Sequence, residues 1–470
     1  MRSAIALLGL AAALPAGAQA PVPDGAQFQI NTYTTHNQNY SSVATDADGD
    51  FVVVWQSYGS SGTDTSLYSI QGQRYASDGS PQGAEFQVNT YTTVDQQNPS
   101  VAVDAGGGFF VVWESRGSPG TDTSATSVQG QRYASDGSTQ GGQFQINAYS
   151  TERQVFPSVA AAPGGEFVVV WASSGSNGTD TSSSSIQGQR YASDGSAQGG
   201  EFQVNSYTTN YQGTATVAAA ADGDFVVAWV SRGSFGTDNF YGSIQGQRYA
   251  STGSTQGGQF QVNTFTTFIQ IDASVAMADA GDFVVVWRSV GSYGTDQSDY
   301  SLQGQRYASD GSMQGGQFQV NTYTTDDQRS PTAAMDADGG FVVTWSRAKP
   351  LFGFGPQSIQ GQRYASDGST LGGEFQVNSV ASDYQFAPSV AARDGDFVVA
   401  WTSFGTLGTD TSSLALQGQR YSLPTPVPLG VPAMSPAARF ALGAVLMLLG
   451  AGYALRRRAA RREPARAAQA

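Results

Sequence analysis

Seven tryptophans recur along this chain at nearly constant spacing, and this regularity limits the possible folds more than any other feature. Intervals of 58 residues separate the first six, and 56 residues separate the last two. The tryptophans are Trp55, Trp113, Trp171, Trp229, Trp287, Trp345 and Trp401. Self-similarity at a fixed period is typical of repeat architectures, in which each repeat is one supersecondary unit. The sequence between the two ends therefore consists of seven copies of one unit.

Each copy predicts four β-strands and no helix. It reads approximately Phe-Gln-Val-Asn, a variable loop, Ser-Val-Ala, a tight turn, Phe-Val-Val-Val-Trp, a longer loop, and Ile-Gln-Gly-Gln-Arg-Tyr-Ala-Ser-Asp-Gly. In the first copy the strands are expected at 42–45, 51–55, 70–76 and 86–89. The run at 51–55 is continuously apolar and β-branched, which suits burial on both faces. Asp-Gly turns separate the first strand from the second, and the third from the fourth.

Four antiparallel strands repeated seven times predict an all-β, seven-bladed β-propeller over residues 21–422. The array begins with an unpaired strand at 28–31 and stops at Tyr421, after the third strand of its last copy. We therefore expect the N-terminal strand to complete the last blade, which closes the ring and leaves no open sheet edge. A β-solenoid or a row of small sandwiches is the alternative.

The N-terminus and the composition predict an exported protein. Residues 1–20 read as a signal peptide, with Arg2, an apolar stretch at 4–14 and the small-x-small site Ala18-Gln19-Ala20. The chain has no cysteine, which excludes disulfides and thiolate chemistry. Its net charge of −14 argues against a nucleic-acid partner. A monomeric propeller outside the cytoplasm is expected.

The C-terminal end predicts a membrane anchor. Residues 423–436 form a proline-rich linker with a short motif, 437–458 a transmembrane helix with an arginine cluster, and 459–470 a cytoplasmic tail. This order resembles the IPTL-CTERM class of bacterial sorting signals. The residues that carry the resemblance are Val431, Pro432, Ala433 and Met434, followed after the apolar run by Arg456, Arg457 and Arg458. The resemblance implies membrane insertion, processing and surface display, so the protein is expected at the inner membrane or sorted to the cell surface. A plain C-terminal anchor is the alternative.

The two faces of the predicted propeller differ in their connections. One face has short, nearly uniform turns, and the other has long loops that vary between copies, which is where binding residues usually lie. On these loops a cation and several aromatic rings suggest a glycan or protein ligand. The candidate ligand-binding residues are Lys349, Phe352, Phe354, Tyr58, Phe235 and Tyr293. The alternative is that the rings pack against neighbouring blades.

The same loops carry a recurring Gly-Thr-Asp sequence. Its aspartates are Asp64, Asp122, Asp180, Asp238, Asp296 and Asp410. A ring of carboxylates can hold Ca²⁺, which prefers oxygen ligands. The other interpretation is that each aspartate caps its own turn. Apart from this calcium hypothesis, no cofactor is predicted.

The sequence offers little evidence of catalysis. His36 is the only histidine, so no Ser-His-Asp set can be assembled. Glu114, Glu152 and Asp326 are carboxylates at loops or strand ends, with nothing in the sequence to pair them for glycoside hydrolysis. The prediction is therefore a binding or adhesion propeller that is not an enzyme, with a passive envelope scaffold as the alternative and a propeller glycosidase less favoured.

Overall fold

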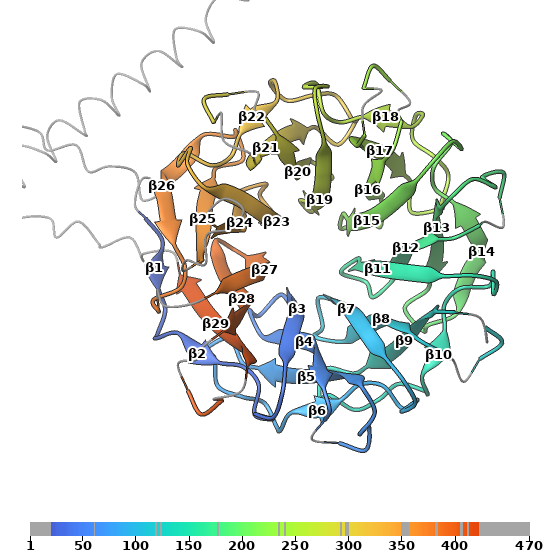
Figure 1. Ribbon diagram of the computed structural model, residues 1–470, viewed down its shortest axis with the longest axis vertical. Coiled ribbons are helices and arrows are strands. Elements are labelled where there is room, and N and C mark those ends of the chain that lie inside the picture. The colour runs from blue at the N-terminus through green and yellow to red at the C-terminus, as the bar shows by residue number, and fades with distance from the viewer. Residues whose placement is uncertain are drawn as a thin grey trace, which may run out of the picture. The chain divides into compact units, whose positions relative to one another are not determined.

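The computed structural model describes residues 20–422 except 61, 118–119, 123–124, 176–177, 234–235, 239–240, 292–293, 297–299, 349–356, 381–383, 405–407 and 411–412. Its β-strands form seven antiparallel sheets arranged around a common centre (Figure 1). The predicted seven-bladed propeller of four-stranded blades is therefore confirmed. In this part of the chain, no helix is long and apolar enough to cross a bilayer. The predicted signal sequence up to residue 19, the sorting motif and the transmembrane helix all lie outside the described residues.

The strands are longer than the sequence suggested towards the propeller centre, whereas at the rim four outer strands have only two residues and two have seven. The innermost strands β3, β7, β11, β15, β19, β23 and β27 span Gln38–Thr45, Gln96–Val103, Gln154–Ala161, Gln212–Ala219, Gln270–Met277, Asp327–Met335 and Gln385–Arg393. The second strands β4, β8, β12, β16, β20, β24 and β28 span Phe51–Tyr58, Phe109–Ser115, Phe167–Ser173, Phe225–Ser231, Phe283–Val290, Phe341–Ala348 and Asp396–Phe404. The third strands β5, β9, β13, β17, β21, β25 and β29 span Tyr68–Tyr75, Ser127–Tyr133, Ser185–Tyr191, Ser243–Tyr249, Tyr300–Tyr307, Ser358–Tyr364 and Leu414–Ser422. The outer strands β6, β10, β14, β18, β22 and β26 span Phe86–Gln87, Phe144–Gln145, Ala197–Gln203, Phe260–Gln261, Phe318–Gln319 and Thr370–Gln376.

The recurring tryptophans lie fully buried in the second strand of each blade. Every indole N–H donates to the glutamine side chain at or near the start of the same blade's innermost strand, as from Trp55 to Gln38 at 3.2 Å. The strand that carries the tryptophan packs against a neighbouring blade on each of its two faces. In blade 1, Val52 and Val54 pack towards blade 2, and Val53 packs towards blade 7. This two-sided burial explains why the run at 51–55 lacks polar residues.

The ring closes through the N-terminus. Strands β1 (Val22–Pro23) and β2 (Phe28–Gln29) both pair with β29, the third strand of blade 7. In Figure 1 these blue strands lie beside the red end of the propeller. Asn31 extends the contact, since it donates to Asp410 at 2.7 Å and accepts from the Leu416 backbone at 2.8 Å. The predicted closure by an N-terminal strand is confirmed.

The arginine of the third strand links adjacent blades. Arg74 donates to the backbone carbonyls of Ser135 and Asp136, in the Ser-Asp-Gly turn of the next blade, at 2.7 and 2.6 Å. Such charge-assisted bonds are stronger than bonds between neutral groups. Arg363 in blade 6 has no Ser-Asp-Gly turn of blade 7 beside it, because this sequence does not follow Tyr421. One terminal nitrogen of Arg363 is buried without a partner.

Candidate functional site

Seven residues with left-handed backbone conformation surround the propeller axis on the face that carries the long loops. Each lies at a β-bulge near the start of an innermost strand, where the register with the second strand shifts. Their φ values lie between 47° and 54°. We call them the inner ring: Tyr40, Asn98, Phe156, Thr214, Asp272, Ser330 and Ala387.

The inner ring combines backbone strain with variation. None of its members is glycine, although L-residues disfavour positive φ, most of all when β-branched as Thr214 is. Tyr40 is 50% exposed and Phe156 is 43% exposed. Bulges and strained residues of this kind concentrate at functional sites, where they direct side chains. The inner ring thus differs from the strands of the core, whose sequences are nearly identical between blades.

Glu114 lies next to this ring and is the residue directly after Trp113. Its side chain is buried, and its Oε2 accepts a hydrogen bond from Asn98 Nδ2 at 3.1 Å. Burial raises the pKa of the Glu114 carboxyl above its usual value. The hydrogen bonds from the Asn98 side chain and the Phe156 backbone, with the charges of Arg153 and Arg116, act in the opposite direction on this pKa. A buried carboxyl with a raised pKa suits proton donation.

The inner-ring carboxylate Asp272 belongs to an ion pair in blade 5. Asp272 lies 3.0 Å from Arg288, which occupies the position directly after Trp287. The Arg288 guanidinium stands 4.6 Å from the centre of the Tyr300 ring, and Arg329 of blade 6 stands 5.5 Å from the same ring. Polar and charged side chains therefore line both the blade 2 and the blade 5 sides of the inner ring.

The predicted ligand-binding residues fall largely on parts of the chain that the structure leaves out. Lys349, Phe352, Phe354, Phe235 and Tyr293 lie outside the described residues. Tyr58 is described at the end of β4, half-buried between two rings, with centroids 5.3 Å from His36 and 5.3 Å from Tyr68. The Tyr58 ring thus packs within its own blade, and a ligand role for these six residues stays a prediction.

The recurring loop aspartates are buried and hydrogen-bonded. Asp64 accepts from Asn89 Nδ2 at 2.7 Å, and also from the backbone and hydroxyl of Ser66 at 3.0 and 2.6 Å. An asparagine that follows the outer strand donates in the same way to the other five aspartates, which are Asp122, Asp180, Asp238, Asp296 and Asp410. These contacts favour the interpretation that each aspartate caps its own turn. Over the described residues, no three His, Asp or Glu side chains gather to hold a metal ion.

Sequence comparison identifies no relative, but the fold resembles solved structures. No protein-family model matches the chain, and no curated protein does. The polysaccharide lyase Uly1 is 11% identical over 88% of this chain and 96% of that chain, with a TM-score of 0.49. The Penicillium chrysogenum alpha-L-arabinanase is 13% identical over 85% and 99%, with a TM-score of 0.44. The NanB sialidase from Streptococcus pneumoniae is 10% identical over 85% and 71%, with a TM-score of 0.46.

These similar structures correct the functional prediction. All three are enzymes by name, a lyase, an arabinanase and a sialidase. The prediction of a binding or adhesion propeller that is not an enzyme is wrong on this comparison, and the passive scaffold is withdrawn with it. The sequence argument named Glu114, Glu152 and Asp326 as carboxylates but found no residue to pair with any of them. Glu114 was already visible there, but its partner Asn98 lies on another strand of blade 2.

Proposed function

We propose that this protein is a glycan-active enzyme in which Glu114 transfers the proton. The observation that supports this most is the buried Glu114 carboxyl, with its raised pKa, beside the strained inner ring. Only one of the seven positions that follow a tryptophan carries a carboxylate. The other six residues are Gln56, Ala172, Val230, Arg288, Ser346 and Thr402. This position differs in every blade while the tryptophan before it is constant, and variation on a constant scaffold is typical of a functional site.

The chemistry follows from the protonation state. A carboxyl whose pKa is raised by burial holds its proton to a higher pH than an exposed one, and it can pass that proton to the glycosidic oxygen as the carbon–oxygen bond to the leaving sugar breaks. Water then adds to the anomeric carbon and loses a proton to a second carboxylate.

Exposed rings next to Glu114 supply a means of holding sugars. Aromatic faces stack on the apolar faces of sugar rings while leaving hydroxyl groups free to hydrogen-bond. Phe156 donates its backbone N–H to Glu114 and exposes its side chain, and Tyr40 exposes its ring from blade 1. A glycan bound across these two rings lies on the same face as the Glu114 carboxyl.

The test is turnover of polysaccharides by the full-length protein. Arabinan, a sialylated glycan and an acidic polysaccharide are incubated with the wild type, and new reducing ends are measured. We expect Glu114→Gln to lower kcat at least about 100-fold while the fold is kept. Ser346→Ala, at the equivalent position of blade 6, is the control and should retain activity, because the Ser346 hydroxyl contacts the Arg329 carbonyl and neither aromatic ring. Full activity in Glu114→Gln, or no product from any of these substrates with the wild type, would refute the proposal.

We also propose that the reaction takes place outside the cytoplasm, where polysaccharides are accessible. Support comes from the signal-peptide pattern and from the sorting-signal resemblance of the tail. Fractionation of cells producing the full chain and a chain ending at Pro428 tests this. The shorter protein should leave the membrane fraction.

A further inference from the structure

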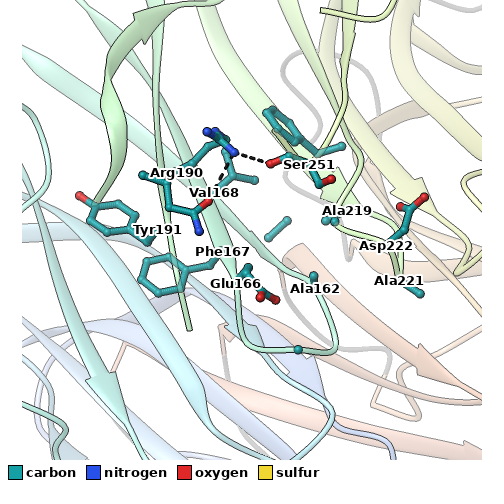
Figure 2. Close-up of a pocket in the computed structure, with 15 residues that line it drawn as sticks. Ala162, Glu166, Phe167, Val168, Arg190, Tyr191, Ala219, Ala221, Asp222 and Ser251 are labelled. Carbon is teal, nitrogen blue, oxygen red and sulfur yellow. Dashed lines mark hydrogen bonds between the residues drawn. The ribbon is translucent and has the colours of Figure 1, made fainter. Parts of the chain in front are cut away.

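A cleft of about 410 Å³ lies between blades 3 and 4, on the face with the short turns and therefore opposite the inner ring (Figure 2). Blade 3 contributes Glu166, Arg190 and Tyr191, and blade 4 contributes Asp222 and Ser251. The corresponding hollow between blades 7 and 1 measures about 140 Å³. This junction is thus unusually open for a repeat whose blades are otherwise alike.

Two residues of blade 3 explain why the cleft is open. In blades 1 and 2 the turn after the innermost strand begins with Asp46 and Asp104, whose carboxylates lie against the next blade's turn at Gly107 and Gly165. Blades 3, 4 and 5 have the smaller Ala162, Ala220 and Ala278 at this position. In blade 3, therefore, no carboxylate from this position reaches towards blade 4.

The second residue is Pro163. At neighbouring junctions a backbone N–H of this turn donates to the next blade, from Ala105 to Pro163 and from Ala221 to Asp279, at 3.3 and 3.1 Å. Between blades 3 and 4 the donor position is Pro163 itself, which has no N–H. The two turns are therefore not tied together, and the cleft remains open.

The groups around the cleft present both acceptors and a donor. Glu166 and Asp222 are exposed carboxylates at its rim, on blades 3 and 4 respectively, and Figure 2 shows them on different sides of the hollow. Arg190 contacts the Ser251 carbonyl and lies 3.4 Å from Gln198 Oε1. At the base, the Phe167 and Tyr191 rings stack with centroids 4.8 Å apart. The cleft thus combines charged and polar groups around its rim with an aromatic base.

This mixture of charges selects the ligand class. Two carboxylates disfavour an anion, and the Arg190 guanidinium disfavours a compact cation. A neutral molecule with many hydroxyl groups can donate to Glu166 and Asp222, accept from Arg190, and place an apolar face on the aromatic base. We propose that the cleft between blades 3 and 4 binds a neutral sugar unit of a glycan, as a site separate from the one around Glu114.

The repeat itself supplies the variant that tests this. Ala162→Asp introduces the residue that blades 1 and 2 already carry, where Asp104 accepts from the backbone of Gly106 and Gly108 at 2.8 and 3.0 Å. The equivalent N–H groups exist in blade 3 at Gly164 and Glu166, so the variant should fold. Its carboxylate should fill the cleft. Ala278→Asp makes the same change in blade 5 and is the matched control.

Binding is measured by calorimetry on full-length protein carrying Glu114→Gln, so that no substrate is consumed. The probes are maltotriose, cellotriose and arabinotriose as neutral sugars, glucuronic acid as an anion and spermidine as a cation. We expect saturable binding of at least one neutral trisaccharide, weakened at least tenfold by Ala162→Asp and unchanged by Ala278→Asp. Glu166→Gln combined with Asp222→Asn should also weaken it.

Other outcomes would overturn the proposal. These are no binding of any neutral trisaccharide, binding of glucuronic acid or spermidine alone, or equal affinity in Ala162→Asp and its control. The result is independent of the enzymatic proposal, because loss of turnover in Glu114→Gln and loss of binding in Ala162→Asp are read from different variants and different measurements.

Discussion

Glu114 and Asn98 form a side-chain hydrogen bond of 3.1 Å at two positions that carry a different pair of residues in every other blade. In blade 5 the same two positions hold Arg288 and Asp272, 3.0 Å apart. The repeat therefore places two unlike polar pairs on one ring while its core stays constant. That contrast separates the residues that maintain the propeller from those to which we assign the proposed reaction.

The hydrogen bond from Asn98 predicts the pH dependence of the reaction. It stabilises the ionised form of Glu114 and so lowers a pKa that burial raises. In Asn98→Ala this opposing effect is lost, the pKa of Glu114 rises further, and the acid keeps its proton to higher pH. We expect the alkaline limb of the kcat/KM profile to move to higher pH. Ser330→Ala, an inner-ring change in blade 6, should leave the limb in place, and a shift to lower pH in Asn98→Ala would contradict the assignment.

Asp336 predicts a pH dependence of stability at the junction of blades 6 and 7. Burial, opposed by a backbone bond from Gly395 and the charge of Arg363, raises the pKa of Asp336 to about 6. In the unfolded chain an aspartate titrates near about 3.9. The folded state therefore holds this proton more tightly, and the stability it provides is present below about pH 4 and lost as the pH rises through about 6.

The size of this effect is at most about 3 kcal/mol, since each unit of pKa difference corresponds to about 1.4 kcal/mol. Denaturant unfolding at several pH values, on wild type and Asp336→Asn, measures it. The difference in unfolding free energy between the two proteins should change across pH 4 to 7 in favour of the variant. Parallel curves would show that Asp336 does not titrate in this range.

The contacts of the loop aspartates predict that calcium is not needed for stability. Both carboxylate oxygens of Asp64 already accept hydrogen bonds, from Ser66 and from Asn89. Adding EDTA or millimolar Ca²⁺ should therefore leave the unfolding temperature unchanged. Asn89→Ala should lower the unfolding free energy by about 1–3 kcal/mol, because it leaves buried groups without a partner. A clear rise of the unfolding temperature with Ca²⁺ would restore the metal interpretation.

The sequence predicted the architecture because the architecture is repeated. A buried Trp55 in an apolar run, Asp-Gly turns and an unpaired strand at 28–31 each follow from local chemistry, and seven copies reinforce one another. The inner ring has no such signature. The bulge forces Tyr40 and Phe156 into a conformation that these residue types disfavour, so the propeller as a whole and not the local sequence determines it.

The site was missed for a related reason. Glu114 acquires its properties from burial and from residues on other strands, which only the assembled blades bring together. The cleft shows the same limitation. Ala162 recurs as Ala220 and Ala278 in blades 4 and 5, and Pro163 belongs to a surface turn, so neither residue indicates a cavity in the sequence. Their effect arises between two blades, where a missing carboxylate and a missing N–H leave space.

The closing strand offers a prediction with an almost identical internal control. The ring of Phe28 lies over Gly418, where an added Cβ would be 2.7 Å away, and that of Phe86 lies over Gly72 at the same distance. The two rings also meet the next tyrosine alike, Phe28 with Tyr75 at 5.6 Å and Phe86 with Tyr133 at 5.5 Å. Their direct packing contributions should therefore be equal.

The Phe28 and Phe86 strands differ in how the chain connects each of them to its partner strand. The Phe86 strand follows β5 through a short turn, so it remains close to its partner when packing is lost. The Phe28 strand belongs to the N-terminal segment and pairs with β29 at the far end of the sequence. Its release therefore opens the ring, and re-forming the contact costs more loop-closure entropy. We expect Phe86→Ala to lower the free energy of unfolding by about 3 kcal/mol and Phe28→Ala to lower it distinctly more. Denaturant unfolding measures both losses. Phe28→Ala should also be cleaved faster by a protease. Equal losses in the two variants would show that ring closure adds nothing to stability beyond local packing.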